Sequence, residues 1–179
     1  MRRGEAVIIQ TPNQFVADTL LPDFPPAHPL RNPAWAGLAF DRNRYEDLAP
    51  APVWDALFAT HVRQGGPEKL LVISADDLGN GTAARVEPSR NAVMAYLQED
   101  VRFLRDHYIL SPRQDWLCRL DQDVTLIAGE SGFLQEVVVA CGGFSAVMDI
   151  MEDDFDPGPT DAAGLRRYLV ELVRGLNRK

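Results

Sequence analysis

The clearest pattern along this chain is an apolar residue at every third or fourth position between residues 89 and 107. Such spacing places apolar side chains on one face of a helix, so we expect a long amphipathic helix over 89–107. On its solvent-facing side, Arg102 and Asp106 have the spacing of an ion pair. The residues that define the apolar face are Val93, Leu97, Val101 and Leu104.

Three further stretches have helical periodicity. Residues 161–177, with Thr160 as N-cap, predict a second strong amphipathic helix, and residues 53–62 predict a shorter one. Apolar residues between 133 and 141 also recur at helical spacing. The β-branched run 137–139 leaves a strand as an alternative there.

Short apolar runs predict the strands. Residues 116–120 and 124–128 flank the short connection 121–123, an arrangement typical of a β-hairpin. The strongly apolar run 69–74 is the best candidate for a central strand. Two more short strands are predicted at 5–10 and 35–40.

The order of these elements mixes a hairpin with helices, which favours the α+β class over a doubly wound parallel sheet. We expect a single globular domain over residues 1–179, with a mixed or antiparallel sheet packed against amphipathic helices. A chain of 179 residues with 46% hydrophobic residues can bury a substantial core without disulfides or a structural metal.

Charge is distributed very unevenly along the chain. The formal net charge is −8, from 26 acidic residues against 18 Lys and Arg. Residues 120–165 carry ten of the acidic residues and no Lys, Arg or His, so the remainder of the chain is slightly basic. Such asymmetry creates a directional field that attracts a basic partner and repels nucleic-acid phosphate.

The densest part of this acidic window is residues 149–156, where apolar side chains stand among five acids. An apolar anchor surrounded by carboxylates suits the centre of an interface with a basic protein. A solvated acidic loop is the alternative interpretation. The residues predicted to bind a partner are Asp149, Met151, Glu152, Asp153, Asp154, Phe155 and Asp156.

One string in the window resembles a catalytic signature. Residues 121–125 (Asp-Gln-Asp-Val-Thr) resemble the Asp-x-Asp-x-Thr motif of haloacid-dehalogenase-type phosphatases. That resemblance implies Asp121 as nucleophile, Asp123 as general acid and a Mg²⁺ ion held by further carboxylates such as Asp153 and Asp154. Against it, only 54 residues follow Thr125, and no cation stands between the motif and those carboxylates. A polar turn at a hairpin tip is the other interpretation.

Other patterns exclude several kinds of site. Cys118 and Cys141 lack the Cys-x-x-Cys spacing of zinc and redox centres, and the three His residues are scattered, so we expect no metal and no cofactor. No apolar run approaches the roughly 20 residues that span a bilayer, and the N-terminal run is too short for a secretory signal. We therefore expect a cytoplasmic protein that binds neither membrane nor nucleic acid.

These observations favour a non-enzymatic acidic binding protein. In size, charge and lack of catalytic motifs the chain is similar to bacterial immunity proteins, including those of contact-dependent growth inhibition systems. This likeness implies that it neutralises a toxin, such as a nuclease, whose cationic site the carboxylates would cover. A Mg²⁺-dependent phosphotransfer enzyme using Asp121 and Asp123 is one alternative, and an adaptor or structural protein is another.

Overall fold

The computed structural model describes residues 10–21, 29–80, 82–155 and 162–176. Within these residues the strands form one six-stranded sheet in the order β1-β6-β5-β4-β2-β3, and every neighbouring pair is antiparallel. The strands are β1 (Trp35–Asp41), β2 (Leu70–Ser74), β3 (Ala84–Val86), β4 (His107–Leu110), β5 (Trp116–Leu120) and β6 (Val124–Glu130).

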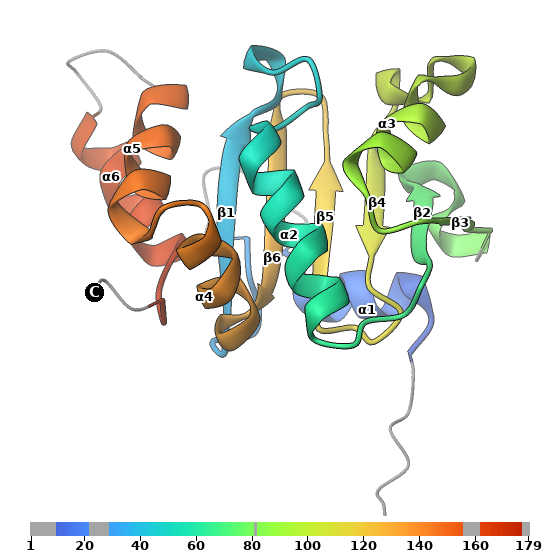
Figure 1. The fold of residues 1–179 in the computed structure, drawn as a ribbon, viewed down its shortest axis with the longest axis horizontal. Helices are drawn as coiled ribbons and strands as arrows, with labels where there is room; N and C mark the ends of the chain where they lie inside the picture. The colour runs from blue at the N-terminus through green and yellow to red at the C-terminus, as the bar shows by residue number, and fades with distance from the viewer. Residues whose placement is uncertain (1–9, 22–28, 81, 156–161, 177–179) are drawn as a thin grey trace, which may run out of the picture.

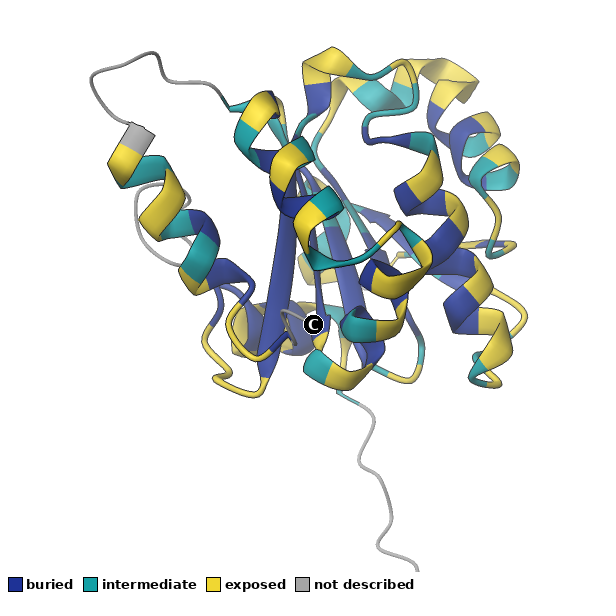
Figure 2. Ribbon diagram, turned by 60° about the vertical axis from the view of Figure 1, so that its left-hand side comes forward, coloured by how far each residue is buried: buried dark blue, intermediate teal, exposed yellow. Residues whose placement is uncertain are grey.

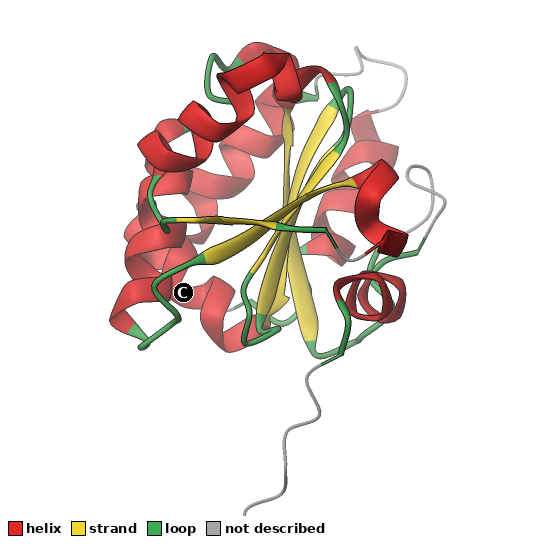
Figure 3. Cartoon of the chain, turned by 90° about the vertical axis from the view of Figure 1, so that its right-hand side faces the viewer, coloured by secondary structure: helices red, strands yellow, loops and turns green. Residues whose placement is uncertain are grey.

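Helices cover both faces of the sheet (Figures 1 and 3). The α-helices are α1 (Pro12–Thr19), α2 (Ala51–Arg63), α3 (Arg90–Gln98), α4 (Ser131–Ala140), α5 (Phe144–Asp154) and α6 (Ala162–Leu172). Three short 3-10 segments are η1 (Arg42–Arg44), η2 (Ala75–Asn80) and η3 (Glu99–Leu104). Helices α2, α3 and α4 lie on the front face in Figure 1 and α1 on the back, while α5 and α6 lie beside the edge strand β1.

The core has two parts, because the sheet buries side chains on both faces (Figure 2). The larger part, between the sheet and the front helices, contains the fully buried Phe40, Trp54 and Trp116. The smaller part lies under α1 and contains Trp35 and Leu117. Alternation of side chains along the strands supplies both parts, since successive residues point to opposite faces.

Much of the predicted secondary structure is confirmed. The α+β class is correct, the hairpin is β5 and β6, and the strand expected at 35–40 is β1. The predicted central strand is β2, which is interior but lies next to the short edge strand β3. The ambiguous run 137–139 belongs to helix α4, and the amphipathic helix predicted over 161–177 is α6, which ends earlier, at Leu172.

The long helix predicted over 89–107 is wrong in its second half. Helix α3 ends at Gln98, and His107 already belongs to β4. The chain breaks because Asp100 and Val101 have φ values of 52° and 50°, outside the helical region. Arg102 pairs with Glu99 and Asp100 instead of Asp106.

Several observed elements were not predicted, and some predictions fall on residues that the structure does not describe. Strands β3 and β4 and helix α1 were not predicted, and the stretch expected as a loop or helix end around 149–156 is mostly helix α5. Of the strand expected at 5–10, residues 5–9 lie outside the described residues, and Gln10 is in no regular element. Thr160, the expected N-cap, and Asp156 also lie outside the described residues.

Candidate functional site: an acidic edge

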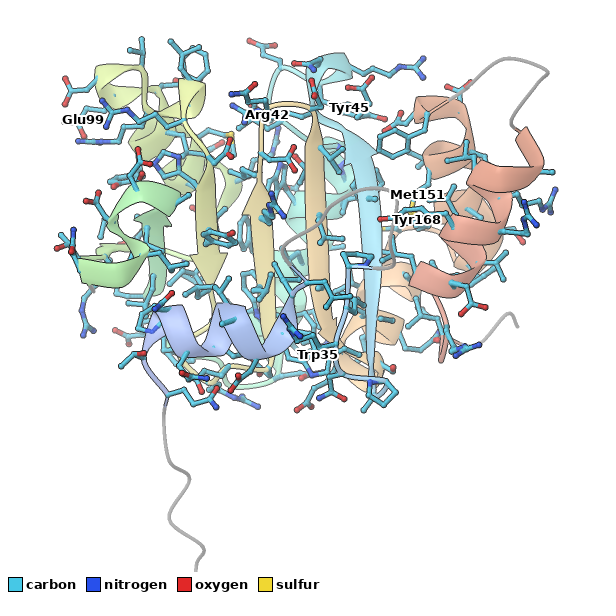
Figure 4. All side chains as sticks on the ribbon, turned by 180° about the vertical axis from the view of Figure 1, so that it is seen from behind. Trp35, Arg42, Tyr45, Glu99, Met151 and Tyr168 are labelled. Carbon is cyan, nitrogen blue, oxygen red and sulfur yellow. The ribbon has the colours of Figure 1, made fainter. Side chains whose placement is uncertain are left out.

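Carboxylates from four separate segments gather at one end of the sheet. This is the upper end in Figure 1, where β1 and β5 finish and β4 and β6 begin. Figure 4 shows Arg42 and Tyr45 at this end and Trp35 at the opposite, lower end. We give the name acidic edge to a set of carboxylates at this end, together with Asp149, which lies one turn before Asp153 on α5: Asp41, Glu46, Asp106, Asp121, Asp123, Asp149, Asp153 and Asp154.

The 3-10 segment η1 joins the two halves of the acidic edge. Asn43 contacts the β5–β6 turn, with its amide Nδ2 3.5 Å from Asp123 Oδ1. On its other side Arg44 reaches the end of α5, 3.4 Å from the Asp153 carboxylate and 3.8 Å from that of Asp154. Carboxylates about thirty residues apart in the acidic window therefore flank one short segment in the fold.

Arg42 is the buried cation of this end. It is 7% exposed, and its guanidinium donates hydrogen bonds to the main-chain oxygens of Asp121 and Phe103. Burial lowers the Arg42 pKa, and the nearby carboxylates of Asp106, Asp121 and Asp123 oppose that shift. One side chain thus fastens the segment after β1 to the β5–β6 turn and to η3.

Asp154 has a structural role at the edge of β1. Its carboxylate accepts a 2.5 Å hydrogen bond from the Tyr45 hydroxyl and a 3.1 Å bond from the Asp41 main-chain N–H. Met151, one turn earlier, accepts from the Ala39 N–H through its sulfur at 3.3 Å. Helix α5 therefore caps outward-facing N–H groups of the edge strand, which blocks pairing with a further strand.

This capping corrects two of the predicted partner-binding residues. Met151 is 0% exposed and the Asp154 side chain is 2% exposed, so neither offers a surface to a partner in this fold. Burial raises the Asp154 pKa against the lowering effect of its bonds to Tyr45 and Asp41. Burial also raises the Tyr45 pKa, with the hydrogen bond to Asp154 as the next cause.

The other predicted residues fall into three groups. Asp149 and Asp153 are exposed one turn apart on the outer side of α5. Glu152 is half-buried and lies 3.6 Å from Arg166 of α6, which offsets its charge. Phe155 is half-buried against the smaller part of the core and is not the exposed anchor expected between the acids.

Asp121 and Asp123 form the tip of the β5–β6 hairpin. Asp121 Oδ1 accepts hydrogen bonds from the main-chain N–H groups of Asp123 at 3.0 Å and Val124 at 2.7 Å. This is the geometry of an Asx turn, in which the carboxylate holds the turn. The motif that resembles a phosphatase signature therefore follows an antiparallel strand, whereas that signature ends a parallel one. Among the described residues, no group of three or more His, Cys, Asp or Glu is placed to hold a metal ion.

Sequence reasoning missed the part of the acidic edge that lies outside the acidic window. Asp41, Glu46 and Asp106 stand in segments with neighbouring arginines, so a local charge count conceals them. The strand order brings them to the window, because β1 and β4 lie on either side of the β5–β6 hairpin. Three exposed members, Glu46, Asp123 and Asp149, make no ion pair within the described part of the chain.

Comparison of the chain with protein-family models, with curated proteins and with solved structures found no match. No single helix in the described residues has the length and apolar character to cross a membrane. Helices α4 and α5 together pass that test, but they meet at 87°.

Proposed function

We propose that the protein is a non-enzymatic binding protein whose acidic edge docks a basic protein partner. The observation that carries this proposal is the convergence of four segments on one end of the sheet, each contributing carboxylates. Carboxylates gathered in this way produce a field that orients and accelerates the approach of a cationic surface.

The exposed carboxylates are free to serve this role because the fold does not depend on them. Asp153 is 79% exposed, and its pair with Arg44 at 3.4 Å is of the surface kind that contributes little to stability. Asp149, Asp123 and Glu46 are also exposed. At this end the buried side chains of Arg42 and Asp154 make the hydrogen bonds that hold the fold together.

The partner class that fits is a toxin domain with a cationic site, such as the phosphate-binding site of a nuclease. In this proposal the protein is a bacterial immunity protein that acts in the cytoplasm, as in contact-dependent growth inhibition. Carboxylates placed over a phosphate site mimic the charge of the substrate and exclude it.

The test compares two variants of equal charge. The edge variant carries Glu46→Gln, Asp123→Asn, Asp149→Asn and Asp153→Asn, and the control variant carries Asp18→Asn, Glu68→Gln, Glu87→Gln and Glu130→Gln. Each removes four negative charges from exposed positions. Tagged wild type and both variants are used to recover a partner from the native cell, and association rates with the purified partner are then measured at several salt concentrations.

We expect the edge variant to associate about tenfold or more slowly at low salt, with a flattened salt dependence. The control variant should associate nearly as fast as wild type, because its lost charges lie away from the edge. Equal slowing in both variants would show that association depends on the net charge of the protein and not on the acidic edge, which would also contradict the proposal. Unchanged association in the edge variant would contradict the proposal.

A further inference from the structure

The segment η3 has a strained backbone at two adjacent positions. Asp100 and Val101 are consecutive residues with positive φ, at 52° and 50°. Asp tolerates this left-handed conformation, but it is highly unusual for a β-branched residue such as Val. Strain of this kind persists only where surrounding contacts impose it.

Arg102 makes the contacts that accompany this conformation. Its guanidinium donates to the main-chain oxygen of Tyr96 at 3.0 Å and lies 4.4 Å from the centre of the Tyr96 ring. It also pairs with the carboxylates of Glu99 at 2.6 Å and Asp100 at 3.4 Å. These contacts link η3 to α3. Phe103 packs against the core, whereas Val101 and Leu104 stay exposed.

The result is a pair of exposed apolar side chains on one short loop. Val101 is 55% exposed and Leu104 is 66% exposed. Comparable exposure of a large apolar side chain occurs at Val62 (58%) and Val139 (62%), which lie on helices α2 and α4. Those two sit in regular helices, whereas η3 exposes Val101 through a strained backbone.

The buried side chain of Arg42 links the loop that carries this apolar pair to the acidic edge. The Arg42 guanidinium donates both to Phe103, between Val101 and Leu104, and to Asp121 of the acidic edge. Figure 4 shows Glu99 at the same end of the molecule as Arg42. Carboxylates also flank the pair directly, with the Glu99 side chain 66% and the Asp100 side chain 82% exposed.

We propose that Val101 and Leu104 are the apolar anchor of the docking surface, inserting into an apolar recess ringed by Lys and Arg on the basic partner. This inference rests on the proposed function and assigns its central contact to η3 instead of α5. Charge complementarity selects this occupant, because Asp106, Asp121 and Asp123 lie near Arg42, whose guanidinium contacts this loop at Phe103. Glu99 and Asp100 pair with Arg102 but keep their side chains exposed, so they add to the acidic surroundings of the apolar pair. A few desolvated central side chains supply most of the binding energy of an interface, a role that Trp, Tyr and Arg fill more often than Val and Leu.

The experiment uses three synthetic peptides as probes of the whole chain. An amphipathic Lys–Leu peptide carries positive charge and an apolar face, a Lys–Ser peptide carries the same charge only, and a Gln–Leu peptide has the apolar face only. Binding is followed by amide chemical shifts in NMR titrations. Each probe is tested on wild type, on V101S/L104S and on the matched control V62S/V139S, which removes apolar groups of similar exposure elsewhere.

We expect the Lys–Leu peptide to bind wild type and the control variant about tenfold more tightly than the Lys–Ser peptide, with shifts in η3 and the acidic edge. In V101S/L104S the two cationic peptides should bind alike. Equal binding of both peptides to wild type would overturn the anchor while leaving the acidic edge intact. Failure of both cationic peptides to shift the acidic edge would overturn the proposed function as well.

A single substitution gives an independent test of the anchor. Val101→Gly removes the apolar group and also relieves the left-handed strain, because glycine adopts positive φ readily. We expect a higher thermal midpoint together with weaker binding of the Lys–Leu peptide. A higher midpoint with unchanged binding would overturn the role of Val101, since its side chain would then contribute only strain.

Discussion

The two ends of the sheet differ in the side chains that form them: aromatic residues pack at the lower end, and charged residues gather at the upper end. At the lower end, the Trp116 and Phe133 rings stack with centroids 6.0 Å apart, and the Trp116 indole donates to His61 Nδ1 at 3.1 Å. His61 Nε2 then donates to the Pro67 oxygen at 2.9 Å. The upper end instead contains the buried Arg42, the carboxylates of the acidic edge and the strained backbone of η3.

The difference separates stability from proposed function. Aromatic packing at the lower end buries large surfaces, and the hydrogen bonds from Trp116 to His61 and from His61 to Pro67 pair the ring nitrogens, which stabilises the fold. The upper end keeps charge and apolar surface accessible at some cost in local energy, a pattern associated with binding sites. Substitutions at the lower end should therefore change unfolding, and substitutions at the exposed upper end should change association.

The largest effect is expected from Trp116→Ala at the lower end. This change empties the space between His61 and Phe133 and should lower the free energy of unfolding by about 3–5 kcal/mol. Trp116→Phe keeps an aromatic ring and loses mainly the bond to His61, so it should cost about 1–2 kcal/mol. Urea denaturation measures both changes.

The same Trp116 variants also test whether the two ends of the sheet act separately. Their association with the basic partner is measured without denaturant, where they remain folded. Trp116→Phe should leave association at the acidic edge unchanged, because the indole lies at the opposite end of the sheet. An association rate reduced as strongly as in the edge variant would show that the two ends are coupled.

A smaller effect is expected from Arg42→Met at the upper end. The change leaves the main-chain oxygens of Asp121 and Phe103 without their buried donor, and should cost about 2–4 kcal/mol in urea denaturation. It should also raise hydrogen exchange in η3 and the β5–β6 turn more than elsewhere, since Arg42 joins them. Uniform loss of protection across the sheet would contradict this local role.

The sequence predicts the elements that depend on local hydrophobic periodicity, but not those that depend on contacts between side chains. The hairpin and helices α2, α4 and α6 follow from local periodicity, which the final packing respects. The periodic pattern continues past Gln98, but the helix does not, because Arg102 binds back to Tyr96 and the adjacent acids. A side-chain network of this kind leaves no mark on hydrophobic periodicity.

The burial of Met151 and Asp154 could not be predicted from the sequence for a related reason. The acidic run 152–156 conceals the fact that Asp154 lies on the buried face of α5, one turn after Met151. Its partners, Tyr45 and Asp41, are more than a hundred residues away in sequence. Exposed Asp149 and Asp153 were found because charge density is a local property, whereas the grouping of η1 and the β5–β6 turn depends on strand order.

The smallest effect is expected from Asp154→Asn, and its sign depends on pH. Burial raises the folded-state pKa of Asp154, so the folded protein holds this proton more tightly than the unfolded chain. Ionisation of Asp154 therefore costs stability as the pH rises from about 4, the ordinary Asp pKa, through the raised value in the folded protein. Asn carries no charge and keeps an acceptor for Tyr45 or Asp41.

Asp154→Asn should consequently gain stability relative to wild type as the pH rises above about 4, by less than the loss expected from Arg42→Met. The control Asp154→Ala leaves the Asp41 N–H without an acceptor and should be less stable than Asp154→Asn throughout. Urea denaturation of the three proteins at several pH values measures this. A wild type that gains stability over Asp154→Asn as the pH rises would mean that Tyr45 and Arg44 stabilise the ionised carboxylate more than burial penalises it.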